Sequence, residues 1–353
     1  MNKMNRGLKG LEEKVLRKDL CIACGACLSL CPYLRSWQGR VVKLHDCSLE
    51  EGRCFAYCPR AELEFAQIEH EEIGKKYEKI EVGPVRKVWM ARAKDPVWRK
   101  RAQSGGVVSA LIDFALRKKV IDAAILTQRE TDFLPGGRIV RNRQDILTCA
   151  GSSYVSGPTL EAFHKGPWQE GEKIGVVGLP CQAFALTRMK SSSLEKRTPV
   201  DKVGLVIGLF CTWALEYERF IAFLKVRVGK SDIYKLEITP PPERLLKVYT
   251  NGQLYAIPVD EIRPFIREGC HVCSDMTAEF SDISAGTVEG IDGWNTMIVR
   301  SDRGEALFKE AEKEGVIECQ SIPEAHLNHL KEASILKKER ALNTIKEREG
   351  MSR

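Results

Sequence analysis

Residues 21–32 read CIACGACLSLCP, and their spacing sets the fold of the N-terminal part of the chain. The stretch contains four cysteines and ends in a proline; the cysteines are Cys21, Cys24, Cys27 and Cys31. Three thiolates on so tight a loop can hold three corners of one iron-sulfur cube, while the fourth cysteine points towards a second cube. Gly25 relieves crowding inside the loop. The spacing therefore predicts a small cluster-binding module.

The C-x2-C-x2-C-x3-C-P spacing is that of bacterial-type ferredoxins, and Cys58-Pro59 closes the pattern. We expect a first group that holds one cluster: Cys21, Cys24, Cys27 and Cys58. A second group is expected to hold another: Cys31, Cys47 and Cys54. The second group departs from the ferredoxin pattern, because Glu50 and Glu51 stand where a further cysteine is expected. A 3Fe-4S cluster, a 4Fe-4S cluster with an oxygen or solvent ligand, and an incomplete site all stay open there. A zinc ribbon is the alternative, but zinc ligands usually come in two distant pairs.

Thirteen cysteines are the unusual feature of a 353-residue composition that is otherwise typical of a globular protein, with 43% hydrophobic and 29% charged residues. The longest apolar stretch, residues 203–215, is shorter than the roughly 20 residues of a membrane helix, so no transmembrane segment is predicted. The first residues lack a secretory signal, which predicts a cytoplasmic protein, either free or held at the inner face of the membrane through a partner. Cysteines in that compartment indicate metal ligation or redox chemistry.

Most of the net charge of +7 lies between residues 86 and 101, where the only acid is Asp95. The basic residues of this stripe are Arg86, Lys87, Arg92, Lys94, Arg99, Lys100 and Arg101. A basic stripe with Trp89 and Trp98 interleaved suits an acidic cofactor, an acidic partner or nucleic acid. A solvated face is the plain alternative.

The chain divides into four predicted parts. Residues 1–65 form an α+β ferredoxin-like module, 66–84 a linker or peripheral helix, 85–322 an α/β domain and 323–353 a charged C-terminal surface helix. Strands are predicted at residues 87–93, 122–127, 173–177 and 202–210, and an amphipathic helix is predicted to follow Ser104 as its N-cap. Asn251-Gly252 between two apolar runs predicts a β-hairpin.

A third cysteine group lies in the α/β region: Cys181, Cys211, Cys270 and Cys273. Cys181 and Cys211 each follow an apolar strand, and parallel strands bring their carboxyl ends to the edge of the sheet where cofactors bind. Together with the C-x2-C pair, Cys181 and Cys211 would provide the four cysteine ligands of a third cluster. The alternative is that these cysteines are small buried hydrophobic residues. Cys149 and Cys319 have no neighbouring partner and are predicted to be structural.

Iron-sulfur clusters accept one electron at a time, so electrons from a hydride donor must first pass to a cofactor that accepts two electrons and releases them singly, as flavin does. The α/β domain is therefore predicted to be a flavoprotein domain. Its candidate flavin contacts lie in glycine-rich turns and beside them: Ser104, Gly105, Gly106, Ser152, Ser153, Tyr154, Gly178, Pro180, Gly286, Gly293 and Asn295. A helix start at Ser104-Gly105-Gly106 offers free backbone N–H groups to a pyrophosphate. A G-x-G-x-x-G fingerprint is not found at these turns, and no general base is named because hydride transfer needs positioning.

Several motifs together resemble the family of coenzyme F420 hydrogenase/dehydrogenase beta subunits over roughly residues 85–320. They are SGGVVSAL at 104–111, VID at 120–122, GSSY at 151–154, GLPCQ at 178–182, GLFC at 208–211, GC and CSD within 269–275, and DISAG at 282–286. The ferredoxin-like extension in front of this region is similar to that of the F subunits of archaeal F420 dehydrogenases.

This resemblance implies FAD, a 4Fe-4S cluster on the third cysteine group and hydride exchange with the deazaflavin F420. It also implies a larger electron-accepting complex as partner, such as a membrane dehydrogenase, a heterodisulfide reductase or a hydrogenase. Because F420 carries a phosphodiester and a polyglutamate tail, Arg99, Lys100 and Arg101 are predicted to bind it. We therefore expect an F420 dehydrogenase of methanogen-type energy metabolism that does not bind nucleic acid. The alternatives are a chlorophyll-reductase-like enzyme, a non-enzymatic electron-transfer subunit and, more remotely, a nucleic-acid-binding zinc protein.

Overall fold

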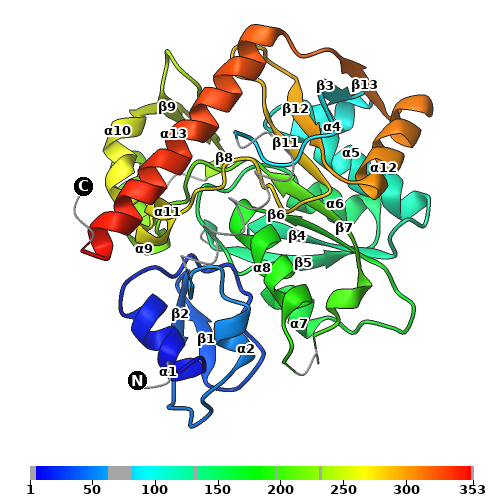
Figure 1. Cartoon of the computed structure of the whole chain (residues 1–353). Helices are drawn as coiled ribbons and strands as arrows, with labels where there is room; N and C mark the ends of the chain where they lie inside the picture. The colour runs from blue at the N-terminus through cyan, green and yellow to red at the C-terminus, as the bar shows by residue number, and fades with distance from the viewer. Residues whose placement is uncertain (1–4, 63–80, 130–132, 195–197, 230–232, 351–353) are drawn as a thin grey trace.

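The central feature of the computed structural model is an eight-stranded mixed sheet, which lies in the middle of the molecule (Figure 1). The structure describes residues 5–62, 81–129, 133–194, 198–229 and 233–350. The strand order is β13-β3-β12-β11-β7-β6-β4-β5. Its middle strands are parallel to one another: β11 (Ile283–Thr287), β7 (Val203–Leu209), β6 (Ile174–Gly178) and β4 (Ala123–Arg129). The outer strands are added antiparallel: β5 (Pro135–Val140), β12 (Asn295–Val299), β3 (Lys87–Ala93) and β13 (Ile317–Gln320). The α/β prediction for this region is confirmed as a mixed sheet, and the four predicted strands correspond to β3, β4, β6 and β7.

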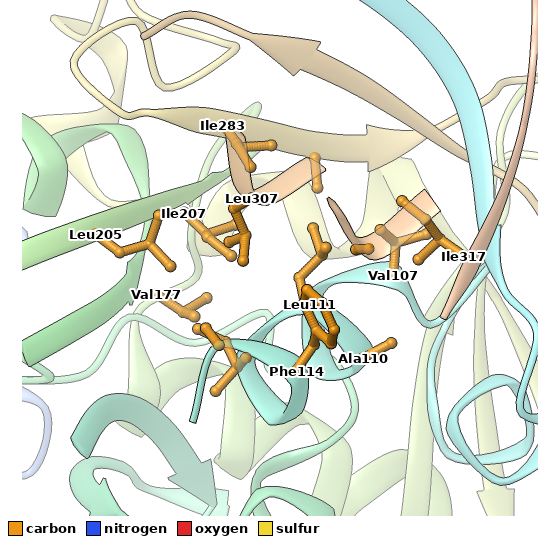
Figure 2. Packing of buried hydrophobic residues seen from close by; sticks show 14 of the residues in the cluster. Val107, Ala110, Leu111, Phe114, Val177, Leu205, Ile207, Ile283, Leu307 and Ile317 are labelled. Carbon is orange, nitrogen blue, oxygen red and sulfur yellow. The ribbon is translucent and has the colours of Figure 1, made fainter. Parts of the chain in front are cut away.

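Helices cover both faces of this sheet because its central strands are apolar on both sides. On β7, Leu205 and Ile207 face one apolar cluster, whereas Val203 and Val206 face another. The first cluster lies under α5 (Val107–Arg117) and α12 (Asp302–Lys313), and Figure 2 shows Leu111 of α5 among these side chains. The second cluster lies under α8 (Pro180–Ser191).

The start of α5 differs from the prediction. Its N-cap is Gly106, at φ +73°, and not Ser104. A Cβ atom at residue 106 would lie 2.8 Å from the Trp98 carbonyl carbon, so the left-handed turn and the close approach both require glycine. The Ser104 hydroxyl instead pairs with the Thr287 hydroxyl at 3.1 Å. The N-cap prediction was wrong because the left-handed backbone conformation of Gly106, and not a capping side chain, begins the helix.

Shorter helices connect the strands of the large sheet. They are α4 (Pro96–Arg101), α6 (Arg143–Cys149), α7 (Glu161–Lys165) and the 3-10 turn η3 (Val200–Lys202). Asp95 caps α4 by accepting a hydrogen bond from the Val97 N–H at 2.9 Å. The end of α4 leads directly into the turn before α5.

A separate three-stranded antiparallel sheet consists of β8 (Ile233–Ile238), β9 (Leu245–Thr250) and β10 (Leu254–Pro258). Tyr249 pairs with Leu254 across the Asn251-Gly252 turn, so the predicted hairpin is confirmed. The adjoining helical segments are α9 (Tyr217–Val228), α10 (Val259–Ile262), η4 (Arg263–Phe265) and α11 (Glu268–His271). This sheet and α9 share an apolar cluster with residues from the edge of the cavity described below.

The N-terminal module lies against the large domain, at the bottom of Figure 1. Its elements are α1 (Leu8–Leu11), the π-helical segment η1 (Glu12–Leu16), the β1 (Leu34–Trp37) and β2 (Arg40–Lys43) hairpin, and α2 (Arg53–Ala56). The Leu160 N–H donates to the Cys24 carbonyl at 3.1 Å, and Ile22 and Tyr57 belong to the apolar cluster under α8. Residues 63–80, which include the end of the predicted module and residues 66–80 of the predicted linker or peripheral helix, lie outside the described residues. The ferredoxin-like architecture and the domain boundaries stay predictions.

The C-terminal helix α13 (Glu324–Arg348) matches the helix predicted after Pro323. Much of its surface is exposed, as expected, but one stripe is buried: Ser334, Lys337, Ala341 and Ile345. The helix is therefore a packed element and more than a charged surface helix. Among the residues that the structure describes, no helix combines the length and the apolar character needed to cross a membrane.

Candidate functional site

A cavity of about 770 Å³ opens where the central parallel strands end at their carboxyl side. This volume lies within the range of sites for cofactors and small ligands. Eight of the predicted flavin contacts line it: Ser104, Gly106, Ser152, Ser153, Tyr154, Gly178, Gly286 and Asn295. Gly105, Pro180 and Gly293 are not among the lining residues. The cavity therefore gathers turns that are far apart in the sequence.

Polar side chains hold the cavity wall in shape. The Tyr154 hydroxyl accepts from the Ile238 N–H at 2.8 Å, and burial raises the pKa of Tyr154 to about 12. The Asn295 amide donates to the Gly286 carbonyl at 3.1 Å, and the Ser152 hydroxyl donates to the Gln103 amide oxygen. These side chains fix the turns, so the backbone of the turns is positioned to meet a ligand.

The N-terminal end of α5 supplies backbone donors to this wall. The first hydrogen bond at this end of the helix runs from the Ala110 N–H to the Gly106 carbonyl at 3.2 Å, so the preceding amides have no partner within the helix. The Val107 N–H has only a long contact of 3.5 Å to the Asn295 amide oxygen. Such an end attracts anions.

Arg129 is a cavity residue that the sequence reasoning missed. Among the described residues that line the cavity it is the sole lysine or arginine. One guanidinium nitrogen donates to the Tyr234 carbonyl at 2.7 Å, while Nη1 is buried and has no hydrogen-bond partner among the residues that the structure describes. Burial lowers the pKa of Arg129. No motif marks this residue, because it stands at the end of β4 in an unremarkable polar run.

Cys149, His326 and His329 also line the cavity. Cys149 was predicted to be structural, and burial raises the pKa of its thiol. His326 and His329 belong to α13, and His329 contacts the Glu289 carboxylate at 2.7 Å. The C-terminal helix thus forms part of the wall, which its charged sequence did not indicate.

The basic stripe lies outside the cavity. Arg99, Lys100 and Arg101 are not among its lining residues, which begin at Ala102. The Arg99 guanidinium donates to the carbonyls of Ala93 and Lys94, at 2.6 and 2.8 Å. Lys100 and Arg101 are exposed. Much of the rest of the stripe is bound in ion pairs, such as that between Arg92 and Glu318 at 2.5 Å.

The third cysteine group comes together beside the cavity, and Cys211 belongs to both. Cys181 lies in the first turn of α8 and Cys211 follows β7; β6 and β7 are parallel, as predicted. Burial, together with neighbouring thiolates, raises the pKa of Cys181 well above its usual value and that of Cys211 to about 12. Burial also raises the pKa of Cys270. For Cys273, Lys337 and Arg60 outweigh the effect of burial and lower the pKa.

Two buried cations next to this group test whether it suits an anionic metal centre. Arg60 is 5% exposed and donates to the Gly269 and Pro59 carbonyls, at 2.9 and 3.1 Å. Burial lowers the pKa of Arg60, but the thiolates of Cys273, Cys181 and Cys270 raise it by more. Lys337 is 4% exposed and faces the thiolates of Cys273, Cys211 and Cys270. Buried charges require counter-charges, which thiolates bound to metal supply and neutral thiols do not. The residues therefore fit an iron-sulfur cluster.

The first cysteine group lies next to the third. Cys24 and Cys27 are buried, and burial together with neighbouring thiolates raises the pKa of Cys24 to about 12. Cys24 also contributes to the raised pKa of Cys181. A backbone N–H two residues on faces the sulfur of Cys24, as the Ala23 N–H does for Cys21 at 3.4 Å. Hydrogen bonds to cluster sulfurs are a typical feature of iron-sulfur sites.

The second group lies beyond the first. Burial raises the pKa of Cys54 to about 12, and Cys31, Cys47 and Cys58 add to this rise. Glu50 and Glu51, the residues in the place of a further cysteine, are both exposed. Within the described ranges, no set of three or more Cys, His, Asp or Glu side chains is arranged to hold a single metal ion. The groups run in the order cavity, third, first, second.

Comparison of the sequence and structure with known proteins identifies relatives of this chain. The N-terminal and C-terminal models of the coenzyme F420 hydrogenase/dehydrogenase beta subunit match residues 88–164 and 171–325. The beta subunit of coenzyme F420 hydrogenase from Methanothermobacter thermautotrophicus is 30% identical over 276 residues, 76% of this chain and 97% of the relative. The chain belongs to the family of coenzyme F420 hydrogenase/dehydrogenase beta subunits.

Two further relatives of the family extend the comparison. The F subunit of the F420H2 dehydrogenase from Methanosarcina mazei is 30% identical over 303 residues, which cover 84% of this chain and 83% of that relative. A chain from a structure of the F420-reducing [NiFe] hydrogenase complex of Methanosarcina barkeri superposes with a TM-score of 0.71 at 28% identity, over 77% of this chain and 95% of that one. The matched family segments contain the third cysteine group, whereas the first and second groups and Lys337 lie outside them.

Proposed function

We propose that this protein oxidises reduced coenzyme F420 at an FAD bound in the cavity and passes the electrons singly through iron-sulfur clusters to a partner complex, as an F420 dehydrogenase. The observation that carries the proposal is the position of Cys211. This residue lines the cavity and belongs to the third cysteine group, so a ligand in the cavity lies beside a metal centre held there. The names of the relatives supply the substrate class.

Bound FAD would supply the conversion of a hydride donor's electron pair into single electrons, with the protons passing to solvent. The chain provides binding and orientation. The free amides at the start of α5 face the cavity and suit the pyrophosphate of FAD. Gly105, whose Cβ would lie 2.9 Å from the Ala91 carbonyl oxygen, lets this turn approach β3 closely.

Two sets of basic residues suit the anionic coenzyme F420. Arg129 lies in the wall with a buried nitrogen that has no partner within the described ranges, which fits a phosphate or carboxylate inside the cavity. Lys100 and Arg101 are exposed just before the lining residue Ala102, where a polyglutamate tail that leaves the cavity would pass. Arg99 is the weakest of the three predicted contacts, because backbone carbonyls occupy its guanidinium.

The cysteine groups define a route for electrons away from the cavity. The third group would hold a 4Fe-4S cluster on Cys181, Cys211, Cys270 and Cys273, and the first would hold another on Cys21, Cys24, Cys27 and Cys58. The second group, with Cys31, Cys47 and Cys54, would hold the exit centre with three cysteine ligands. Two exposed apolar side chains of the module, Leu44 and Leu49, precede and follow Cys47 in the sequence. A larger electron-accepting complex would dock there, and its location would set whether the protein acts free in the cytoplasm or at a membrane.

The test is an anaerobic assay of the purified, FAD-loaded protein with reduced F420 as donor and a one-electron dye as acceptor, and with NADH as control donor. Turnover with reduced F420 and not with NADH is expected. If the protein contains clusters but binds no flavin and does not turn over, it is an electron-transfer subunit. If it turns over only with a donor other than reduced F420, it is a different reductase.

Two cysteine variants in the same cavity wall sharpen this test. Cys211→Ser is expected to keep flavin bleaching by reduced F420 but to lose the EPR signal of the third centre. Cys149→Ser, which changes a thiol in the wall that has no part in the group, is expected to keep both. Equal loss in the two variants would contradict the position given to Cys211.

A further inference from the structure

We propose that the buried ammonium group of Lys337 raises the reduction potential of the centre held by the third cysteine group, so that α13 is part of the redox machinery. The inference rests on the proposed function only in requiring a cluster on these cysteines. Lys337 is a positioning residue, since it acts on the centre through charge and through the loops that carry the cysteines.

Lys337 joins two of the cysteine loops. Its Nζ donates to the Cys211 carbonyl at 2.6 Å and to the Asp275 carbonyl at 2.8 Å. One of these loops carries Cys211, and the other carries Cys273 two residues before Asp275. Both acceptors are neutral carbonyls, so these hydrogen bonds orient the ammonium group but leave its charge uncompensated.

The compensating charge comes from the cysteines and from Asp275. Lys337 faces the sulfurs of Cys273 and Cys211 and the carboxylate of Asp275. The Oδ2 atom of Asp275 accepts from the Glu279 N–H at 2.9 Å, and its Oδ1 atom is buried with no hydrogen-bond partner among the described residues. Glu279 is in turn paired with Lys338. The sulfurs of the third group and the Asp275 carboxylate are therefore the counter-charges of Lys337.

The geometry of α13 explains why a lysine on this helix reaches the cysteines. Ala333, one turn before Lys337, lines the cavity together with His326 and His329. Further along, Ile345 packs into the apolar cluster of the N-terminal module, and the Arg348 guanidinium donates to the Lys18 carbonyl at 3.4 Å. Figure 1 shows α13, coloured orange to red, as one continuous helix. It contacts the cavity, the third group and the module in succession.

A fixed positive charge stabilises the reduced form of a neighbouring centre, which carries one more electron, over the oxidised form. The effect is strong where water is excluded, and Lys337 is 4% exposed. Because the Lys337 ammonium donates to the loops that carry Cys211 and Cys273, its strongest effect falls on the third centre. The centre beside the cavity thereby becomes the better electron acceptor.

The experiment is an EPR-monitored redox titration of the full-length, cluster-loaded protein without F420. The signal of the third centre is identified as the one lost in Cys273→Ser. Lys337→Gln keeps an N–H donor and removes the charge, Lys337→Met removes both, and Lys346→Met removes an exposed charge from the same helix as a control. We expect both Lys337 variants to shift the equilibrium towards the oxidised third centre by about tenfold or more, and tenfold equals 59 mV for one electron. The other centres and Lys346→Met are expected to keep their potentials.

Several results would overturn the proposal. They are an unchanged potential in Lys337→Gln, an equal shift in Lys346→Met, and loss of the cluster in both Lys337 variants, which would make the lysine a purely structural residue. The titration uses no F420, so wild-type protein that titrates normally but fails to oxidise reduced F420 contradicts only the proposed function. Wild-type protein without iron and sulfide contradicts both.

Discussion

Replacing Gly25 with alanine tests whether the first cysteine group is built by close docking of the module on the large domain. Gly25 has φ +89°, and a Cβ there would lie 2.6 Å from the Glu161 backbone nitrogen and 2.7 Å from the Pro158 carbonyl oxygen. A left-handed conformation costs a residue with a side chain about 1–2 kcal/mol. Backbone atoms cannot move aside cheaply, so the loop must withdraw and lose the hydrogen bond from Leu160 to Cys24, which adds about 1–3 kcal/mol. The expected loss in the free energy of unfolding is thus about 2–5 kcal/mol.

The assay is chemical denaturation of the cluster-loaded protein, together with its iron content. Gly171→Ala is the matched control, because Gly171 has φ +74° and no atom within 4 Å of its added Cβ. It is expected to cost only the conformational part, about 1–2 kcal/mol. Gly25→Ala should also lose iron from the first group, whereas Gly171→Ala should not. Equal destabilisation by the two substitutions, with full iron content in both, would refute the close docking at Gly25.

Three further predictions concern the cavity, the core and a buried histidine. Arg129→Met is expected to raise KM for reduced F420 about tenfold or more, since hydrogen bonds to charged groups contribute about 1.5–3 kcal/mol. The control Lys119→Met, at an exposed lysine, should leave KM unchanged, and an unaltered KM in Arg129→Met would show that this residue does not bind F420. Leu111→Ala, at a side chain that is 0% exposed, is expected to lower the free energy of unfolding by about 2–5 kcal/mol in denaturant titrations. Leu254→Ala, at 50% exposed, should lower it by less than about 0.5 kcal/mol, and similar decreases in the two variants would contradict the packing of Leu111 in the core. Burial lowers the pKa of His164 from 6.5 to about 4, so the unfolded state binds a proton that the folded state does not, and the free energy of unfolding falls as the pH drops from 6.5 to 4. Denaturation at several pH values should show a smaller fall in His164→Gln, and the same pH profile in variant and wild type would contradict the assigned burial of His164.

The sequence predicted the sheet and the cysteine groups better than the cavity wall. Apolar runs such as residues 203–209 are read directly as buried parallel strands, and the ferredoxin spacing groups the N-terminal cysteines without knowledge of the fold. The third group needed the parallel alignment of β6 and β7 to bring Cys181 and Cys211 together. Arg129 gave no signal, because its role depends on a cavity formed by segments that are distant in sequence.

The buried stripe of α13 shows a different limit of sequence reasoning. Its members Ser334, Lys337, Ala341 and Ile345 include only one large apolar residue, so hydrophobic periodicity marks no buried face. Lys337 is buried because the cysteines and Asp275 compensate its charge, and that depends on tertiary structure. In the same way, the basic stripe reads as a binding surface in sequence, but in the fold much of it forms ion pairs and hydrogen bonds to backbone carbonyls.

The most direct measurement of the central claim is freeze-quench EPR of the anaerobic, FAD-loaded and cluster-loaded protein mixed with reduced F420 in the absence of any dye. The cavity and the adjoining cysteine groups predict that F420 becomes oxidised while signals of reduced iron-sulfur clusters appear, and that Cys211→Ser abolishes the signal of the third centre while flavin reduction continues. Oxidation of F420 with no reduced cluster in the wild type, or no oxidation by fully loaded protein, would contradict the claim that the cavity delivers electrons from F420 into the cysteine groups.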